Sequence, residues 1–182
     1  INGAIDDTVD GDIVSVEMGI YNEDVNFDGK NITVISTSRP SVTTILGSSM
    51  AVQISSGETS DASLDGFTIT GGSYGLYVQN ASPLIRDCVF ADNTSYAAYI
   101  YYYAAPTFED CTFEDNSGTY PVYMYLYTEP TFTGCTFQNN SAVHGGGMFI
   151  DSYNDVVADD CTFTGNTASN YGGAMYVGHS AL

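Results

Sequence analysis

The stretch Asp160-Cys161-Thr162-Phe163-Thr164-Gly165-Asn166 decides the fold, because the chain repeats its pattern several times. The pattern is Cys-x-Phe-x-x-Asn, and three earlier copies begin at Cys88, Cys111 and Cys135. A more distant copy at 67–72 has Phe67 in the cysteine position. From Phe67 to Cys161 the copies are 21, 23, 24 and 26 residues apart. A period in this range is typical of a solenoid, in which each repeat forms one coil.

A second pattern lies between these copies and consists of a tyrosine or phenylalanine between two apolar residues. It occurs at 76–78, 98–100, 122–124, 148–150 and 175–177. Such alternation is the period-two pattern of a strand with one buried face. The two patterns predict two strands per coil, and no helical spacing of apolar residues persists after residue 10. We therefore expect an all-β chain, a right-handed parallel β-helix of about seven coils, with the hand set by the usual rule for parallel crossovers.

The inward positions of the first pattern are the expected core. Two columns are predicted to stack inside the coils: Phe67, Cys88, Cys111, Cys135 and Cys161 in one, and Phe90, Phe113, Phe137 and Phe163 in the other. The closing asparagines suit a left-handed turn conformation. We expect their amides to hydrogen-bond along the axis as a ladder. These asparagines are Asn93, Asn116, Asn140 and Asn166.

Two resemblances to known families support this fold. Phe-x-x-Asn, as in Phe163 to Asn166, alternates with Gly-Gly-Gly-Met at 145–148 and Gly-Gly-Ala-Met at 172–175. This alternation resembles the paired repeats of the polymorphic outer membrane protein family, which are surface adhesins built as β-helices. The opening at 10–16, Asp-Gly-Asp-Ile-Val-Ser-Val, is similar to the first coil of pectate-lyase-like β-helices. Both resemblances imply a β-helix, and the first implies an adhesive function.

Composition and charge narrow the function classes. The 182 residues include 3 Lys+Arg against 22 Asp+Glu, a formal net charge of −19. Such a chain repels nucleic acid and anionic membranes, and it has no apolar run long enough to span a bilayer. We therefore expect no nucleic-acid partner and no membrane insertion. The composition favours a secreted chain at the extracellular cell surface.

Residues 1–10 are the only candidate for a helix, because Ile1, Ala4, Ile5 and Val9 share one face at helical spacing. We expect this segment to cap the first coil, since the end of a solenoid needs covering; the alternative is a frayed tail. Residues 11–182 are then one parallel β-helix. Its early strands are predicted at 13–16, 25–27, 32–35, 43–46 and 52–54. The last coil has no evident cap, which predicts that the helix continues or pairs with another molecule beyond that end.

Four cysteines in an extracellular-looking chain normally suggest disulfides. Here all four occupy one inward column. Stacked parallel strands lie about 4.8 Å apart, and two cysteines directly above one another on them are poorly placed for the torsion angle that a disulfide requires. We favour a column of buried thiols; the alternative is the pairing Cys88–Cys111 with Cys135–Cys161. The column holds no histidine, so a metal site is not expected there.

The outward positions form aromatic columns, which we expect to bind a partner. Stacked aromatic residues stabilise a sheet on their own, but exposed aromatic patches usually mark interaction surfaces. Sugar rings stack on aromatic faces, and protein partners anchor on tyrosine. The candidate residues are Tyr77, Tyr99, Tyr123, Phe149 and Tyr176 in one column, Tyr101 and Tyr125 in a second that ends at Asp151, and Tyr103, Tyr127 and Tyr153 in a third.

Acidic and amide side chains at the turns are the other candidates. Asp87 and Asp110 align before the cysteines, and Asp92 and Asp115 align before the asparagines. Ca²⁺ takes several oxygen ligands, so these carboxylates are a candidate calcium site; the alternative is that they are solvated turn residues. Asn-x-Ser/Thr sequons make four asparagines candidate glycosylation sites, with burial in the turn as the risk for Asn93. The four are Asn31, Asn80, Asn93 and Asn139.

An enzyme acting on acidic polysaccharide is the alternative to a binding module. β-Helix lyases use a basic residue to abstract a proton, and the regular coils offer only Arg86. A hydrolase needs paired carboxylates on one face, whereas the neighbours Asp159 and Asp160 point to opposite sides of a strand. We interpret His144 and His179 as loop residues.

The sequence thus predicts a non-catalytic extracellular structural or adhesive β-helix. It would bind glycans or protein partners through the tyrosine columns. Assembly with further copies through the C-terminal coil, into a larger surface structure or filament, is the accompanying expectation. A polysaccharide lyase or hydrolase remains the alternative.

Overall fold

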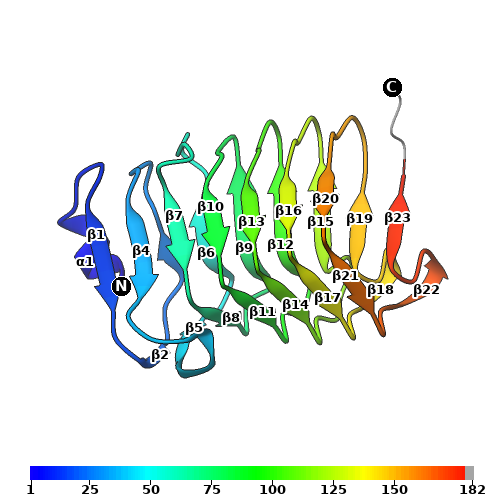
Figure 1. Cartoon of the computed structure of the whole chain (residues 1–182), viewed down its shortest axis with the longest axis horizontal. Coiled ribbons are helices and arrows are strands. Elements are labelled where there is room, and N and C mark those ends of the chain that lie inside the picture. The colour runs from blue at the N-terminus through cyan, green and yellow to red at the C-terminus, as the bar shows by residue number, and fades with distance from the viewer. Residues whose placement is uncertain (179–182) are drawn as a thin grey trace.

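The chain winds into three parallel sheets that run the length of the molecule (Figure 1). The computed structural model describes residues 1–178. Each of the three sheets has seven strands, and neighbouring strands within a sheet come from successive coils. In Figure 1 the coils follow one another along the long axis, from the N-terminal end in blue to the C-terminal end in red. The prediction of an all-β parallel solenoid of about seven coils is confirmed.

Each coil contributes one strand to each sheet, in the same order. The first sheet consists of β1 (Ile13–Val16), β4 (Thr33–Ser36), β7 (Ser63–Asp65), β10 (Leu84–Arg86), β13 (Thr107–Glu109), β16 (Thr131–Thr133) and β20 (Val157–Asp159). The second sheet consists of β2 (Gly19–Tyr21), β5 (Thr43–Leu46), β8 (Thr68–Thr70), β11 (Val89–Ala91), β14 (Thr112–Glu114), β17 (Thr136–Gln138) and β21 (Thr162–Thr164). The third sheet consists of β3 (Val25–Asn26), β6 (Met50–Ile54), β9 (Tyr74–Gln79), β12 (Tyr96–Tyr101), β15 (Val122–Tyr125), β19 (Met148–Ile150) and β23 (Met175–Val177).

Three short elements lie outside these sheets. They are the helix α1 (Asn2–Asp6), the 3-10 helix η1 (Pro40–Val42), and a two-stranded sheet of β18 (Ser141–His144) and β22 (Thr167–Tyr171). Neither helix found in residues 1–178 is long and apolar enough to cross a membrane.

The prediction of two strands per coil was wrong, because each complete coil has three. The missed strand lies directly before the cysteine, as in β10 before Cys88. Asp87, with φ 48°, bends the chain between β10 and β11. The strands on either side have only three residues each. The whole run 84–91 therefore looks like one extended segment in the sequence.

The predicted inward columns are the core. Phe67, Cys88 and Phe113 are fully buried, as are their column partners up to the last coil, where Cys161 and Phe163 are only partly buried. The rings stack face to face from Phe90 through Phe113 and Phe137 to Phe163, with centroids 4.9, 4.9 and 4.5 Å apart. Burying one such side chain contributes roughly 1.5–3 kcal/mol. Coils therefore stabilise one another through continuous columns.

The predicted asparagine ladder is present. Asn93 Nδ2 donates to Asn116 Oδ1 at 3.1 Å, and Asn116 and Asn140 each continue the ladder to the next coil at 3.0 Å. Their backbone conformation was predicted wrongly. The residue before each asparagine takes the left-handed turn, as at Asp92 (φ 54°) and Asp115 (φ 54°). The asparagine side chain therefore points inward, where its amide hydrogen-bonds backbone N–H and C=O groups at the corner.

The four cysteines are free thiols. Each sulfur lies next to a backbone carbonyl of the preceding coil, for example Cys111 Sγ at 3.5 Å from Ile85 O and Cys135 Sγ at 3.6 Å from Phe108 O. Burial raises the pKa of the Cys88 thiol to about 12. The Cys88 thiol therefore stays protonated and packs as a small apolar group.

The helix at the N-terminal end is shorter than predicted. Of the four residues expected on its apolar face, only Ile5 is buried, while Ala4 is exposed and Val9 is 68% exposed. The ammonium of Lys30 donates to the carbonyls of Ile5 and Asp6, at 2.6 and 3.0 Å. A cation at this position satisfies the free carbonyls of a helix C-terminus, so the helix ends there.

Candidate binding surface

The third sheet places the predicted tyrosine columns on its outer surface. Tyr77 pairs with Tyr99, Tyr99 with Tyr123, and the column continues through Phe149 to Tyr176. Successive ring centroids are 5.7, 5.3, 5.3 and 5.2 Å apart. The flanking residues, such as Leu76 and Val78, are buried in the strands up to β19, whereas in β23 Met175 is partly buried and Val177 is exposed. The predicted register is therefore confirmed.

The other two predicted columns lie beside this one. Tyr101 stacks on Tyr125 at 5.9 Å, with an interplanar angle of 14°. Tyr103 stacks on Tyr127 at 5.2 Å, and Tyr127 on Tyr153 at 5.0 Å. These last three residues have φ values of 55°, 59° and 60°, so this column lies on the turn that follows the strands.

Sequence reasoning missed a fourth aromatic column. It consists of Tyr74, Tyr96, Tyr120, His144 and Tyr171. Tyr74 stacks on Tyr96 at 5.0 Å, and His144 stacks on Tyr171 at 5.4 Å. The strict alternation breaks beside it, because Gly75 and Leu76 are both buried. The repeated spacing of three, from Tyr74 to Tyr77 and again from Tyr96 to Tyr99, was the available signal.

Together these side chains form one connected aromatic surface, which we call the tyrosine face. Tyr102 joins the columns, at 5.8 Å from Tyr101 and 4.8 Å from Tyr103. Fourteen of the 15 tyrosines belong to the face, and only Tyr21 lies elsewhere. Its members are Tyr74, Tyr77, Tyr96, Tyr99, Tyr101, Tyr102, Tyr103, Tyr120, Tyr123, Tyr125, Tyr127, His144, Phe149, Tyr153, Tyr171 and Tyr176.

The expected role of Phe149 needs correction. Its side chain is only 7% exposed, and Tyr120 lies over it with ring centroids 4.4 Å apart. Phe149 lacks the hydroxyl that its column neighbours carry, so its burial leaves no polar group without a partner. Phe149 thus lies beneath the tyrosine face, with little of its side chain exposed at the surface.

Most tyrosine rings in these columns are stacked along the coil axis, so their flat faces are covered by neighbouring rings. The surface that remains for a partner consists of ring edges and phenolic hydroxyls. Two hydroxyls are engaged within the face: Tyr77 donates to Gln79 Oε1 at 2.6 Å, and Tyr123 donates to Asp151 Oδ2 at 3.3 Å. Desolvation by burial, with neighbouring charges and phenols adding to it, raises the pKa of Tyr77, Tyr99 and Tyr123. The phenols are therefore neutral donors at physiological pH.

The predicted calcium ligands do not come together. Asp87 and Asp110 lie at the corner between the first and second sheets, and Asp92 and Asp115 lie at the next corner. All four are exposed. Across residues 1–178, no three His, Cys, Asp or Glu side chains form a group that could hold a metal ion. A calcium site at these aspartates lacks the ligands that Ca²⁺ requires.

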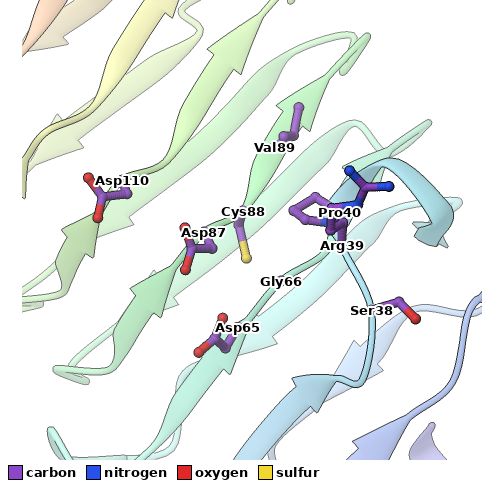
Figure 2. A pocket seen from close by; sticks show the side chains of 9 residues that line it. All are labelled: Ser38, Arg39, Pro40, Asp65, Gly66, Asp87, Cys88, Val89 and Asp110. Atoms are coloured by element: carbon purple, nitrogen blue, oxygen red, sulfur yellow. The ribbon is translucent and has the colours of Figure 1, made fainter.

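A pocket at the corner between the first and second sheets brings Asp65, which the sequence analysis did not single out, near Asp87 and Asp110. Figure 2 shows Asp65, Asp87 and Asp110 in a row on successive coils, with Arg39 on the loop that carries η1. Burial raises the pKa of Asp65; the guanidinium of Arg86 opposes this rise and the charge of Asp87 adds to it. Paired carboxylates with unequal environments are the usual equipment of glycoside hydrolysis.

Arg86, the basic residue considered for a lyase, is paired with two carboxylates. Arg86 Nε is 3.2 Å from Glu109 Oε2, and its Nη1 is 3.8 Å from Asp65 Oδ2. Asp159 ends β20 and Asp160 occupies the following corner, and both are exposed. His144, expected in a loop, lies in β18, and His179 lies outside the described residues.

The four sequons differ in access. Asn80 and Asn139 are exposed at turns, and Asn31 is partly buried with Oδ1 accepting from Thr59 N at 2.7 Å. Asn93 is 1% exposed, and its amide belongs to the asparagine ladder. Asn93 is therefore ruled out as a glycan acceptor in the folded chain, while the other three remain candidates.

Comparison with known families agrees with the fold. The family model described as the right handed beta helix region matches residues 20–182. The chain therefore belongs to the right-handed β-helix family, and the predicted hand is confirmed. No curated protein matches the chain.

Proposed function

We propose that the chain is a non-catalytic binding module of an extracellular surface, and that the tyrosine face is its binding surface. The observation that carries this proposal is the gathering of fourteen tyrosines into one connected surface, over the outer side of the third sheet and the turns and short two-stranded sheet beside it. Packing the coils requires apolar residues on the inner side of the third sheet, but it does not require phenols on the outer side. Contiguous exposed aromatic surface usually marks an interaction site.

The geometry favours a protein partner. A sugar ring stacks on the flat face of an aromatic ring, and most of those faces are covered by stacking within a column, as in the pair Tyr99 and Tyr123 with an interplanar angle of 8°. Ring edges and hydroxyls remain, held in place by their neighbours. Rigid tyrosines of this kind supply amphipathic contact area at low entropy cost, as they do in antibody paratopes. A neutral glycan that binds the hydroxyls is an outcome that the test below can reveal.

The charge of the chain indicates which charge its partner should carry. The three cationic side chains, Lys30, Arg39 and Arg86, all belong to other parts of the coils, whereas Asp151 and Asp155 border the tyrosine face. A net charge of −19 repels uronic-acid polymers and attracts basic surfaces. We therefore expect a partner that is neutral or basic, with arginine or lysine placed over tyrosine rings.

Two features of the sequence support a surface location. The repeats resemble those of surface adhesins of the polymorphic outer membrane protein type, and the sequons Asn80 and Asn139 have exposed side chains, with Asn31 partly buried. Assembly of several copies through the C-terminal coil remains part of the proposal. Its support is that the aromatic columns run along the coil axis, so stacked copies would extend the same face.

A polysaccharide hydrolase is the second candidate. The pocket with Asp65, Asp87 and Asp110 favours it, because a carboxyl with a raised pKa next to ionised carboxylates can serve as a general acid. The lyase alternative has less support, since Arg86 is paired with two carboxylates.

The proposal is tested by selecting ligands for the recombinant chain. Phage-displayed peptides, neutral glycans and polygalacturonate are offered to the wild type and to two variants. The first variant carries Tyr103→Ser, Tyr127→Ser and Tyr153→Ser. The matched control carries Thr112→Ser, Thr136→Ser and Thr162→Ser, which are outward positions of the second sheet. Circular dichroism confirms that all three proteins are folded.

We expect basic peptides to bind the wild type and the threonine variant, and to lose binding to the tyrosine variant. Ligands that bind all three proteins equally would contradict the proposal. Release of reducing ends from any polysaccharide, abolished by Asp65→Asn, would instead establish the hydrolase.

A further inference from the structure

The turn column of Tyr103, Tyr127 and Tyr153 brings three accessible phenols close together. These side chains are 56%, 44% and 49% exposed. Their rings are nearly parallel, with interplanar angles of 9° and 14° and centroids 5.2 and 5.0 Å apart. Each pair joins residues of successive coils, which are 24 and 26 positions apart in the chain. The three rings are thus neighbours only because the chain is folded.

The backbone holds these rings in register. Tyr103 and the preceding Tyr102 both have positive φ, and so do the corresponding pairs Leu126–Tyr127 and Ser152–Tyr153. The amide of Tyr103 donates to Leu126 O at 3.1 Å, which ties the first turn to the second. Non-glycine residues in this conformation are held there by the surrounding structure. The phenols therefore lie side by side in the folded chain, which gives them a high effective concentration.

Other oxidisable groups compete weakly for a one-electron oxidant. The sequence has no tryptophan. The thiols of Cys88, Cys111 and Cys135 are buried, and reactive thiols need to be accessible thiolates. Cys161 is only partly buried, but desolvation raises the pKa of its thiol, which keeps the thiolate scarce. Exposed Met18 is converted to its sulfoxide by oxygen transfer, which is a different reaction. The tyrosine face is therefore the main target for removal of single electrons.

The tyrosine face also connects its inner rings to the turn column. Tyr99 and Tyr101 have centroids 5.6 Å apart, Tyr101 and Tyr102 5.8 Å, and Tyr102 and Tyr103 4.8 Å. A radical formed on an inner ring thus has neighbours at near-contact distance all the way to the exposed column.

We propose that Tyr103, Tyr127 and Tyr153 form a site of oxidative coupling, where a peroxide and a haem peroxidase join neighbouring coils by dityrosine bonds. The oxidant removes one electron and one proton from each of two phenols. The two phenoxyl radicals join through a new Cε–Cε bond. Each coupled ring then loses its Cε proton and regains a proton on oxygen. The net loss of two electrons and two protons reduces one hydrogen peroxide to two waters.

This inference is independent of the binding role. It assigns the turn column a covalent modification that would lock three successive coils together. Such a bond restricts the unfolded chain in the way a disulfide does. The coils of the C-terminal half have no other covalent tie between them in the structure of residues 1–178.

The test treats the dilute, folded chain with a haem peroxidase and limiting hydrogen peroxide. Dityrosine is measured by its fluorescence, and cross-linked peptides are identified by mass spectrometry. We expect Tyr103–Tyr127 and Tyr127–Tyr153 bonds within one chain, at a yield that does not change on further dilution. Tyr127→Phe should remove both bonds, because this ring belongs to both pairs. Tyr103→Phe should leave only the Tyr127–Tyr153 bond, and Tyr153→Phe only the Tyr103–Tyr127 bond.

The control variant is Tyr21→Phe, because Tyr21 lies outside the tyrosine face. It should give the wild-type yield. Phenylalanine keeps the stacked ring, and a thermal melt of each variant verifies folding. Dityrosine that is absent, that forms only between chains, or that persists in Tyr127→Phe would overturn the proposal. If a variant fails to fold, the peptide map of the wild type alone still decides between these outcomes.

Discussion

One buried asparagine in each regular coil closes the corner between the second and third sheets. Its Oδ1 accepts from the backbone N–H and the Nδ2 of the asparagine one coil earlier, as Asn116 does for Asn93 at 3.0 and 3.1 Å. Its Nδ2 also donates to a carbonyl of the earlier coil, as Asn116 does to Phe90 at 2.8 Å. No other side chain of this size combines an acceptor with two donors in this way, so the ladder explains why asparagine recurs.

The first prediction concerns this ladder. Asn116→Ala should lower the free energy of unfolding by about 2–4 kcal/mol, because several buried polar groups lose their partners. The matched control is Asn139→Gly, at an exposed position with φ 55° that glycine adopts freely. Urea unfolding measures both changes. Equal losses for the two variants would mean that the ladder does not stabilise the corner.

The second prediction concerns the phenol of Tyr123. Burial raises its pKa, and the negative charge of Asp151 raises it further. The folded chain therefore holds this proton more tightly than the unfolded chain does. The corresponding stability is fully present below the unfolded pKa of about 10, and it is lost as the pH rises above that value.

Phenolate absorbance measured against pH checks this prediction, with the urea-unfolded chain as the reference. Asp151→Asn should move the titration of Tyr123 toward lower pH, because a repelling charge is removed. Asp155→Asn is the control for loss of charge alone. A folded chain whose phenols all titrate with the unfolded reference would show that the tyrosine face is not desolvated.

At the scale of the element, the corners between short strands follow a repeated backbone conformation. Asp87, Asp110, Gly134 and Asp160 occupy one column of left-handed corners, and Asp92, Asp115, Asn139 and Gly165 occupy another. Asp, Asn and Gly tolerate this conformation better than other residues. Turn geometry therefore accounts for the recurrence of acidic residues in these columns.

The third prediction tests this explanation. Asp115→Val should lower the free energy of unfolding by about 1–2 kcal/mol, since a β-branched residue is strained at positive φ. Asp115→Gly should be neutral or slightly stabilising, because glycine fits the corner and one like charge is removed. Urea unfolding again gives the comparison. A stability loss for glycine as large as that for valine would indicate that the carboxylate itself matters.

The sequence could predict the columns but not the full coil. Cys-x-Phe-x-x-Asn revealed the second sheet and the next corner, and the tyrosine pattern revealed the third sheet with its register. In the first sheet, the strands predicted at 13–16 and 32–35 correspond to β1 and β4, but the strands from β7 onward were missed. These later strands have three residues each, and only a two-residue corner such as Asp87-Cys88 separates each of them from the second sheet. A period-two pattern cannot show a bend of this kind, since the inward and outward alternation continues on both sides of it.

The candidate binding surface, like the coil, could be predicted only in part from the sequence. Three aromatic columns followed from the repeats, whereas the fourth lies beyond a break in alternation at Gly75 and Leu76. The burial of Phe149 depends on Tyr120, which is distant in sequence and adjacent only in the fold. The pocket around Asp65 depends on the loop of Arg39 crossing over a later coil, which no local pattern reports.

At the scale of the whole molecule, charge opposes the compact fold. A net charge of −19 on one slender solenoid places many carboxylates within a Debye length of one another. Raising NaCl from about 0.01 M to about 1 M shortens the Debye length from about 30 Å to about 3 Å. Screening therefore weakens the self-repulsion of the folded chain.

The fourth prediction is that the melting temperature rises with NaCl. Calcium chloride at matched ionic strength should give the same rise, because the aspartates of residues 1–178 do not form a site for the ion. Differential scanning calorimetry measures both. A much larger rise with calcium at low concentration would contradict the absence of such a site.

The central claim is that the tyrosine face is the binding surface, and its most direct test is to map the bound partner by nitration footprinting. Exposed phenols are nitrated in the free chain and in the chain saturated with its tightest selected peptide, and each tyrosine is quantified by mass spectrometry. Binding at the tyrosine face predicts that nitration falls at Tyr103, Tyr127 and Tyr153 and stays unchanged at Tyr21. Unchanged nitration of the three turn tyrosines, or protection centred on Tyr21, would contradict the claim.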